Sequence, residues 1–196
     1  MKYLVSTIIF LIAGLNVSAQ VITQKTNAKR IDEYIKIKDK SNIEVIYMPA
    51  VDVNKLLEED EIRKNLNIPF RFGYVFDVNY NMQNSGTWAK VENGRVWSLK
   101  IVCQGAYSIN LAYNKFYLPE GSQLYIFNEQ KTILQGPFTS KNNTKTGIFS
   151  SDLIEGSAII LEYFEPDTLN DKAEISISKI VRSEERRVGK ECRSRW

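Results

Sequence analysis

Residues 86–121 constrain the fold of this chain more than any other stretch of its sequence. Apolar side chains alternate there with polar ones, first at Trp97, Leu99, Ile101 and Cys103, and then at Ile109, Leu111 and Tyr113. A period of two residues is typical of strands with one buried face. Asn93-Gly94 and Pro119-Glu120-Gly121 are typical turn sequences. The stretch therefore predicts a pair of core strands, and it contains no candidate catalytic group.

Short apolar or alternating segments predict further strands on both sides of this pair. They cover residues 43–47, a run after Pro69 with Phe70, Phe72, Tyr74, Phe76 and Val78 on one side, and residues 123–127, 131–134, 147–149, 157–164 and 173–181. Gly136-Pro137 predicts a turn, and residues 140–145 predict a polar loop.

One helix is predicted over residues 53–65. Asp52 is a suitable N-cap, and Val53, Leu56, Leu57 and Ile62 form a narrow apolar stripe. Many short strands with one helix in front predict an all-β fold, an antiparallel β-sandwich of jelly-roll-like type with the helix packed on its outside. We expect the side chains that face its core to be buried, namely Trp97, Leu99, Ile101, Leu111, Phe72, Phe76 and Ile160.

The N-terminal residues have the pattern of a processing segment. Residues 1–19 have one basic residue, Lys2, then an apolar run and Val17-Ser18-Ala19, which together predict a signal peptide. An N-terminal anchor or a buried helix is the alternative. Cleavage after Ala19 would export the protein and leave no membrane segment. Residues 20–42 predict a loose leader, and residues 43–181 a single β-sandwich domain.

Residues 182–196, RSEERRVGKECRSRW, differ abruptly in composition from the rest. They match the translation of a common sequencing-library adaptor, so we expect a non-native tail, exposed from Arg182 onward, and a native protein that continues beyond Val181. The formal charge of +3 arises at the ends of the chain, because the tail carries six basic and three acidic groups. Without the tail and residues 1–19, 19 basic groups face 20 acidic ones. We therefore predict no nucleic-acid partner.

The residue inventory excludes several kinds of catalytic site. The chain has no histidine, so it cannot build a Ser-His-Asp or Cys-His nucleophile system or a His-ligated metal site. Its two cysteines, Cys103 and Cys192, are too few for a disulfide framework. We expect no catalytic, cofactor-binding or metal-binding residue, and no cofactor.

Three local patterns suggest sites, but each is better explained otherwise. The consecutive carboxylates at residues 58–61 predict a solvated helix face, because neighbouring helix positions point in different directions. Residues 77–81 imitate the start of a calcium loop, yet Met82 and Trp88 stand where that loop needs glycine and glutamate. A polar strand end and turn is the better interpretation. Asn142-Asn143-Thr144 matches a glycosylation acceptor that matters only in a eukaryotic secretory pathway.

Several segments in order resemble one family. MPAVDVNKLLEEDE, RFGYVFDVNY, NSGTW, NGRVWSLKI, GAYSINLAYNKFYLPEGSQLYIFN and GPFTSKNN are similar to the N-terminal region of secreted trypsin-like serine endopeptidases of Bacteroidota, called lysyl endopeptidases. The resemblance spans residues 48–166 and implies a chymotrypsin-like domain further on. It matches structural positions only: Gly86, Trp88, Trp97, Gly105, Leu111, Phe116, Pro119, Gly121, Gly136 and Pro137. Cys103 departs from it, standing where a small polar residue is expected.

The resemblance implies a non-catalytic pro-region or accessory domain that assists folding, latency or positioning of a cognate downstream protease domain outside the cell. The alternative is a stand-alone extracellular module that binds carbohydrate or protein. Its available aromatic side chains would be Tyr80, Trp88, Tyr107 and Tyr113, although core or edge packing is the more ordinary role for aromatic residues in strands. An enzyme complete in itself is the third possibility, and the missing histidine argues against it.

Overall fold

The computed structural model describes residues 23–36, 42–66, 68, 71 and 73–183. The predicted signal peptide, Phe70, Phe72 and all of the tail after Ser183 lie outside the described residues. No helix within the described ranges is long and apolar enough to cross a membrane. The elements are β1 (Thr23–Lys25), α2 (Ala28–Tyr34), β2 (Glu44–Tyr47), α3 (Val53–Asn65), β3 (Tyr74–Asn81), β4 (Thr87–Val91), β5 (Gly94–Val102), β6 (Ser108–Tyr117), β7 (Gln123–Asn128), β8 (Ile133–Phe138), a 3-10 turn η1 (Ser140–Asn142), β9 (Phe149–Ser150), β10 (Ile154–Glu155), β11 (Ala158–Pro166) and β12 (Glu174–Ser183).

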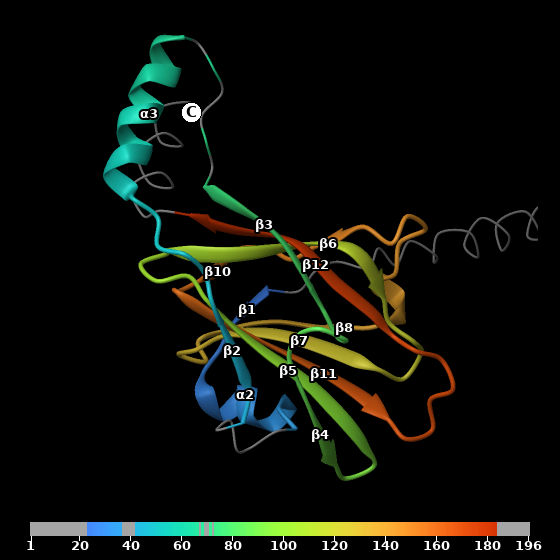
Figure 1. Cartoon of the computed structure of the whole chain (residues 1–196). Helices are drawn as coiled ribbons and strands as arrows, with labels where there is room; N and C mark the ends of the chain where they lie inside the picture. The colour runs from blue at the N-terminus through green and yellow to red at the C-terminus, as the bar shows by residue number, and fades with distance from the viewer. Residues whose placement is uncertain (1–22, 37–41, 67, 69–70, 72, 184–196) are drawn as a thin grey trace, which may run out of the picture.

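The chain is mostly β, and its strands form two sheets (Figure 1). The larger sheet, here sheet A, has the order β1-β8-β7-β11-β5-β2, with β4 also pairing with β5. The smaller one, sheet B, has the order β10-β6-β12-β3, with β9 also pairing with β6. The predicted all-β class is therefore confirmed.

The two core strands predicted from residues 86–121 lie in different sheets and face each other. Trp97, Leu99 and Ile101 of β5 and Ile109 and Leu111 of β6 have no solvent-exposed surface and belong to one hydrophobic core. That core also takes in side chains from β7, β8, β10, β11 and β12. Burial of Trp97, Leu99, Ile101 and Leu111 was predicted and is confirmed. Phe76 packs against the same core but is only partly buried.

Two predicted details of the sheets are wrong. The strands are not all antiparallel, because β2 runs parallel to β5, from Glu44 opposite Leu99 to Tyr47 opposite Val102. Gly136-Pro137 is not a turn but the inside of β8. The register of β7 and β8 shifts there, so two residues of β8 lie opposite one of β7, as in a bulge. Gly136 has a φ of +116°, and a Cβ there would lie 2.7 Å from the carbonyl oxygen of Leu124, so the bulge requires glycine.

Part of the predicted loose leader is ordered, and residues 23–36 are here called the strap. Strand β1 pairs with β8, and α2 is a second helix that the sequence did not predict. Asn27 caps α2 by accepting a hydrogen bond from the Arg30 N–H at 3.1 Å. Ile31 and Ile35 of the strap pack on a second hydrophobic cluster formed by Tyr125, Phe127, Leu134 and Ile160.

This second cluster lies on the face of sheet A that points away from the core. Ile160 is buried, as predicted, but in this cluster, whereas its neighbours Ile159 and Leu161 face the core. Tyr34 stacks on Tyr125 with ring centroids 5.6 Å apart. Glu162, on the same strand as Ile160, accepts a hydrogen bond from the Lys36 N–H. Sheet A is therefore buried on both faces where the strap crosses it.

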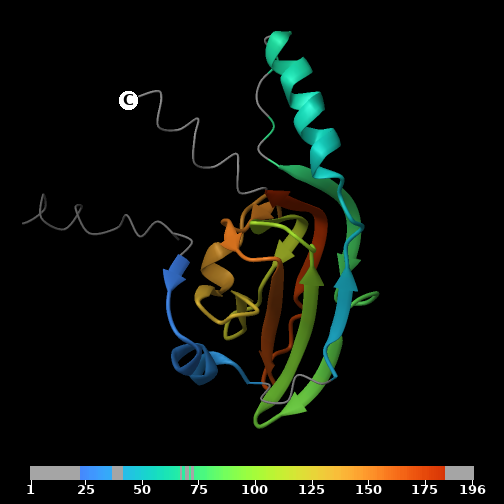
Figure 2. The same cartoon turned by 90° about the vertical axis from the view of Figure 1, so that its left-hand side faces the viewer.

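Helix α3 has the predicted bounds, and the side chain of Asp52 accepts the Lys55 N–H at 3.1 Å, as expected for an N-cap. Its placement differs from the prediction. Both views show it standing beyond one end of the sheets rather than packed along them (Figures 1 and 2). Leu56 is buried, but Ile62 is 61% exposed. The helix therefore buries only part of its predicted apolar stripe.

Strand β12 runs two residues further than predicted. Arg182 and Ser183, which we expected in an exposed tail, pair with Ile109 and Ser108 of β6 and are buried. The Arg182 guanidinium donates to the carbonyl oxygen of Gln104 at 3.1 Å. Removing the chain from Arg182 onward would therefore delete part of sheet B. Its stability would not stay unchanged, as it would if only exposed residues were lost.

Replacing Trp97 by alanine is expected to destabilise the fold by about 3 to 5 kcal/mol, because a large core side chain is lost and a cavity is left. The free energy of unfolding from urea titrations measures this loss. Tyr47→Ala is the matched control, since Tyr47 is 74% exposed and its loss should change stability by less than about 0.5 kcal/mol. Equal effects of the two substitutions would contradict the assigned core.

Ile31→Ala is expected to destabilise the fold by about 2 to 5 kcal/mol, since the Ile31 side chain is fully buried between the strap and sheet A. Ile148→Ala, at a position that is 63% exposed, is the control. Thermal unfolding of both variants tests whether the strap belongs to the cooperative unit. A stability indistinguishable from that of the unchanged chain for Ile31→Ala would contradict this role.

Candidate functional site

Two carboxylates of the acidic run on α3 pair with an arginine. No group of three or more candidate metal ligands occurs in the described part of the chain. Glu59 and Asp60 instead lie 2.7 and 3.4 Å from the guanidinium of Arg71, in the segment after the helix. The hydrogen bond from Arg71 lowers the pKa of Glu59 below its ordinary value. Part of the run thus fastens the helix to the chain after it, and the solvated-face interpretation holds for Glu58 and Glu61, which are exposed.

The four aromatic residues considered for binding lie in different environments. Tyr113 is buried in the core, where burial raises the pKa of its hydroxyl above the ordinary value. Tyr80 and Trp88 are partly buried and pack against the same core. Tyr107 is 38% exposed. The structure therefore does not bring the four together into one binding face.

The segment between β3 and β4, residues 82–86, is where the chain crosses from sheet B to sheet A. Two indoles hold it: Trp97 Nε1 donates to the carbonyl oxygen of Ser85 at 2.8 Å, and Trp88 Nε1 donates to that of Met82 at 3.5 Å. Gly86 has a φ of +81°, and a Cβ there would lie 2.3 Å from Trp97 Nε1. The backbone thus lies directly against the Trp97 ring.

Asparagine side chains tie the start of the same segment. The Asn81 carboxamide oxygen accepts the N–H groups of Gln83 and Asn84 at 2.9 and 3.2 Å. Asn84 returns the contact by accepting the Asn81 N–H at 2.8 Å and donating to the carbonyl oxygen of Asn79 at 2.8 Å. Residues 77–81 therefore end a strand and enter a turn, as predicted. Asp77, the first position of the imitated calcium loop, pairs with Lys179.

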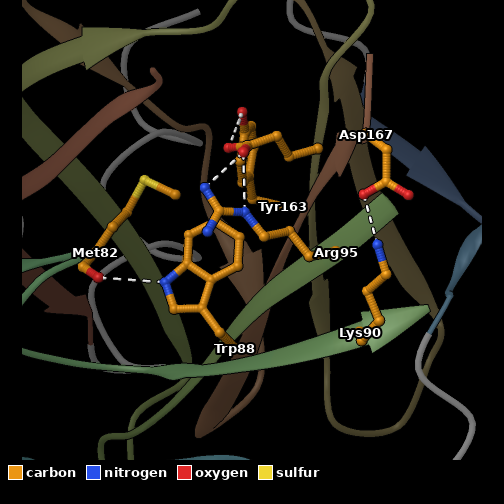
Figure 3. Close-up of polar contacts among 7 residues, drawn as sticks. Met82, Trp88, Lys90, Arg95, Tyr163 and Asp167 are labelled. Atoms are coloured by element: carbon orange, nitrogen blue, oxygen red, sulfur yellow. Dashed lines mark hydrogen bonds and ion pairs between the residues drawn. The ribbon is translucent and has the colours of Figure 1, made fainter. Parts of the chain in front are cut away.

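Trp88 belongs to a cluster that joins β4 and β5 to β11 (Figure 3). The Arg95 guanidinium lies 4.3 Å from the centre of the Trp88 ring and donates to Glu165 Oε1 from Nε and Nη2, at 2.9 and 2.6 Å. The Tyr163 hydroxyl donates to Glu165 Oε2 at 3.4 Å, and its ring meets Trp88 edge-on at 6.2 Å. The charged groups of the cluster thus neutralise each other.

This cluster has the properties of a structural fastening. Arg95 is paired with Glu165, and the neighbouring Lys90 is paired with Asp167 at 2.6 Å. The effect of the cluster is to hold the Trp88 indole where it reaches Met82. The cluster therefore positions the turn.

A hollow of about 230 Å³ lies beside this turn, where β3 ends and β12 begins. Its lining is rich in polar side chains: Asn79, Asn81, Gln83, Asn114, Lys115 and Ser176. Asn79 and Asn81 alternate with Val78 and Tyr80, which pack on the core, so they belong to the outer face of sheet B. Sequence reasoning missed this group, although asparagine at strand positions is a signal, because strands are depleted in it.

A second hollow of about 290 Å³ lies near β1, β6, β8 and β10. Tyr107, Ile133 and Leu153 give it an apolar lining, and Lys25 and Glu155 add one charge of each sign. Of the four aromatics considered for binding, Tyr107 is the one that lines it.

Two further sequence candidates have structural roles. Burial raises the pKa of Cys103 to about 11, with a smaller opposing effect from Arg182, so its thiol stays protonated at neutral pH. Cys103 has no exposed surface and belongs to the main core, so its side chain fills core space. The Asn142 side chain accepts the Thr139 N–H at 2.9 Å and caps η1.

Comparison with known proteins adds no assignment. No family model matches the chain, and no solved structure matches it significantly.

Gly86→Ala is expected to destabilise the fold by more than the roughly 1 to 2 kcal/mol that a left-handed backbone costs an ordinary residue. The extra loss comes from the clash with Trp97. Gly147→Ala is a matched control, because Gly147 has a φ of +67° but nothing lies within 4 Å of a Cβ there. Unfolding free energies of the two variants measure the difference. A Gly86 variant no less stable than the Gly147 variant would exclude the indole contact.

Proposed function

We propose that the two sheets form a β-sandwich of jelly-roll type. The strand order supports this. Take β3, β5, β6, β7, β8, β10, β11 and β12 as the first to the eighth strand. In sheet B the order β3-β12-β6-β10 then becomes first, eighth, third, sixth. In sheet A the order β5-β11-β7-β8 becomes second, seventh, fourth, fifth. This alternation between sheets is the order that two nested Greek keys produce.

The function that we propose is that of a non-catalytic pro-region or accessory domain of a secreted serine endopeptidase. It would assist the folding, latency or positioning of a protease domain located further on in the native protein. The observation that carries the proposal is the ordered resemblance of residues 48–166 to the N-terminal region of such enzymes. The absence of histidine from the sequence agrees with a supporting role.

The positions matched by the resemblance are those on which this fold depends, which strengthens the comparison. Gly86 lies against Trp97, and Gly136 allows the bulge in β8. Gly121 has a φ of +91° in the turn before β7. Leu111 and Phe116 are core residues. A family that shares these residues in this order would share their physical constraints, and hence the architecture.

A stand-alone extracellular binding module is the second candidate, and the two hollows, one beside sheet B and one lined by strands of both sheets, favour it. The two candidates differ in the segment that the native gene encodes after Val181. A protease domain with a His, Asp and Ser triad would support the accessory role. A stop codon or a cell-wall anchor would support the stand-alone module.

The test is to recover the genomic sequence beyond codon 181 and to express the native protein with and without residues 43–181. We expect secretion of active protease to fall when the domain is deleted. The present chain alone should show no turnover of lysyl or arginyl peptide substrates at any pH, because it has no imidazole base. Turnover by this chain that survives repurification and serine-protease inhibitors would refute the non-catalytic assignment.

A further inference from the structure

The hollow beside the β3–β4 turn stands on an irregular part of sheet B. The pairing of β6 with β12 shifts between Ser176 and Ile177, so that Asn114 is an extra residue of β6 without a partner in the register. The pairing of β12 with β3 shifts between Ile177 and Lys179. Bulges re-aim side chains and are enriched next to binding and active sites. Here they surround the hollow that Asn114 and Ser176 line.

Carboxamide side chains are concentrated around this hollow, at strand positions that β-propensity disfavours for asparagine. Asn79 and Asn81 on β3 and Asn114 on β6 occupy strand positions, although asparagine is depleted in strands. The Asn81 side chain is explained by the turn that it holds. Asn79, Gln83 and Asn114 are exposed, and their side chains make no hydrogen bond to another described residue. Natural proteins break such local rules mostly at functional or strained sites.

We propose that this hollow binds one ring of a neutral carbohydrate. A carboxamide both donates and accepts hydrogen bonds, which is what a sugar hydroxyl needs from its partner. Among the described residues that line the hollow, the charged side chains are Lys115 and Glu174, which have opposite signs, so the hollow as a whole favours a neutral ligand. Met82 and Ala173, which are only partly buried, provide apolar surface for the C–H face of a ring.

The size of the hollow sets the size of the ligand group. Its 230 Å³ is below the roughly 300 to 1,000 Å³ of pockets that enclose drug-sized molecules. It therefore suits a single ring of a longer glycan better than a chain of several. The site is also ordered in advance, since two indoles and the Asn81–Asn84 contacts fix the turn that carries Gln83. A fixed site loses less conformational entropy on binding.

The test is affinity electrophoresis of the purified chain in native gels that contain dextran, mannan, laminarin or xylan, with polygalacturonate as an acidic comparison and casein as a peptide comparison. We expect at least one neutral polysaccharide to retard the chain more than polygalacturonate does. Asn79→Ala, Gln83→Ala and Asn114→Ala should each weaken the apparent affinity about two- to tenfold, as expected for the loss of a neutral hydrogen bond.

Asn110→Ala is the matched control, because Asn110 lies on the same strand as Asn114 but does not line the hollow. Gln83 is in an exposed turn, so its substitution reports on binding even if a strand variant unfolds. Failure of all four neutral polysaccharides to retard the chain, or retardation that the three variants leave unchanged, would overturn the proposal. So would retardation by casein alone that the variants abolish, because the site would then bind peptide. Binding by this hollow is independent of the native sequence beyond Val181, so its test is separate from that of the protease association.

Discussion

The contact between Trp97 and the backbone at Ser85 and Gly86 joins the two sheets. The indole lies in the core between them, and its N–H binds the Ser85 carbonyl oxygen. The chain crosses from β3 in sheet B to β4 in sheet A at this point. Because Gly86 has no Cβ, the crossing backbone can lie directly on the ring. The hairpin of β4 and β5, with Trp88 opposite Trp97, takes its position from this contact.

Strand β11 is the second constraint, because it lies between β5 and β7 and is buried on both faces. Ile159, Leu161 and Tyr163 face the core, whereas Ile160 and Glu162 face the strap. A central strand with two apolar faces needs a cover on each side. Sheet B covers one face. The strap of β1 and α2 covers the other, so a segment far away in sequence completes the burial of sheet A.

The sequence predicted most where one rule was sufficient. Period-two alternation located β3, β5 and β6, and an N-cap with an apolar stripe located α3 to the residue. Prediction failed where two structures share the same local chemistry. Gly136-Pro137 is equally typical of a turn and of a bulge, and only the pairing of β7 with β8 distinguishes them. The sequence of helix α2 has too few apolar residues to predict a helix. Ile31 becomes a buried residue only through contact with sheet A.

The hollow beside the β3–β4 turn also could not have been predicted, but the reason is different. Asn79 and Asn114 are 35 positions apart in the sequence and share no motif; the strand order and the bulge in β6 place them around one hollow. The two outer faces of the protein therefore differ in kind. That of sheet A is covered by the protein's own strap, whereas that of sheet B carries exposed carboxamides. A ligand that binds through hydrogen bonds can use the exposed carboxamides on sheet B. On sheet A it would have to displace Ile31 and Tyr34 from a packed apolar cluster.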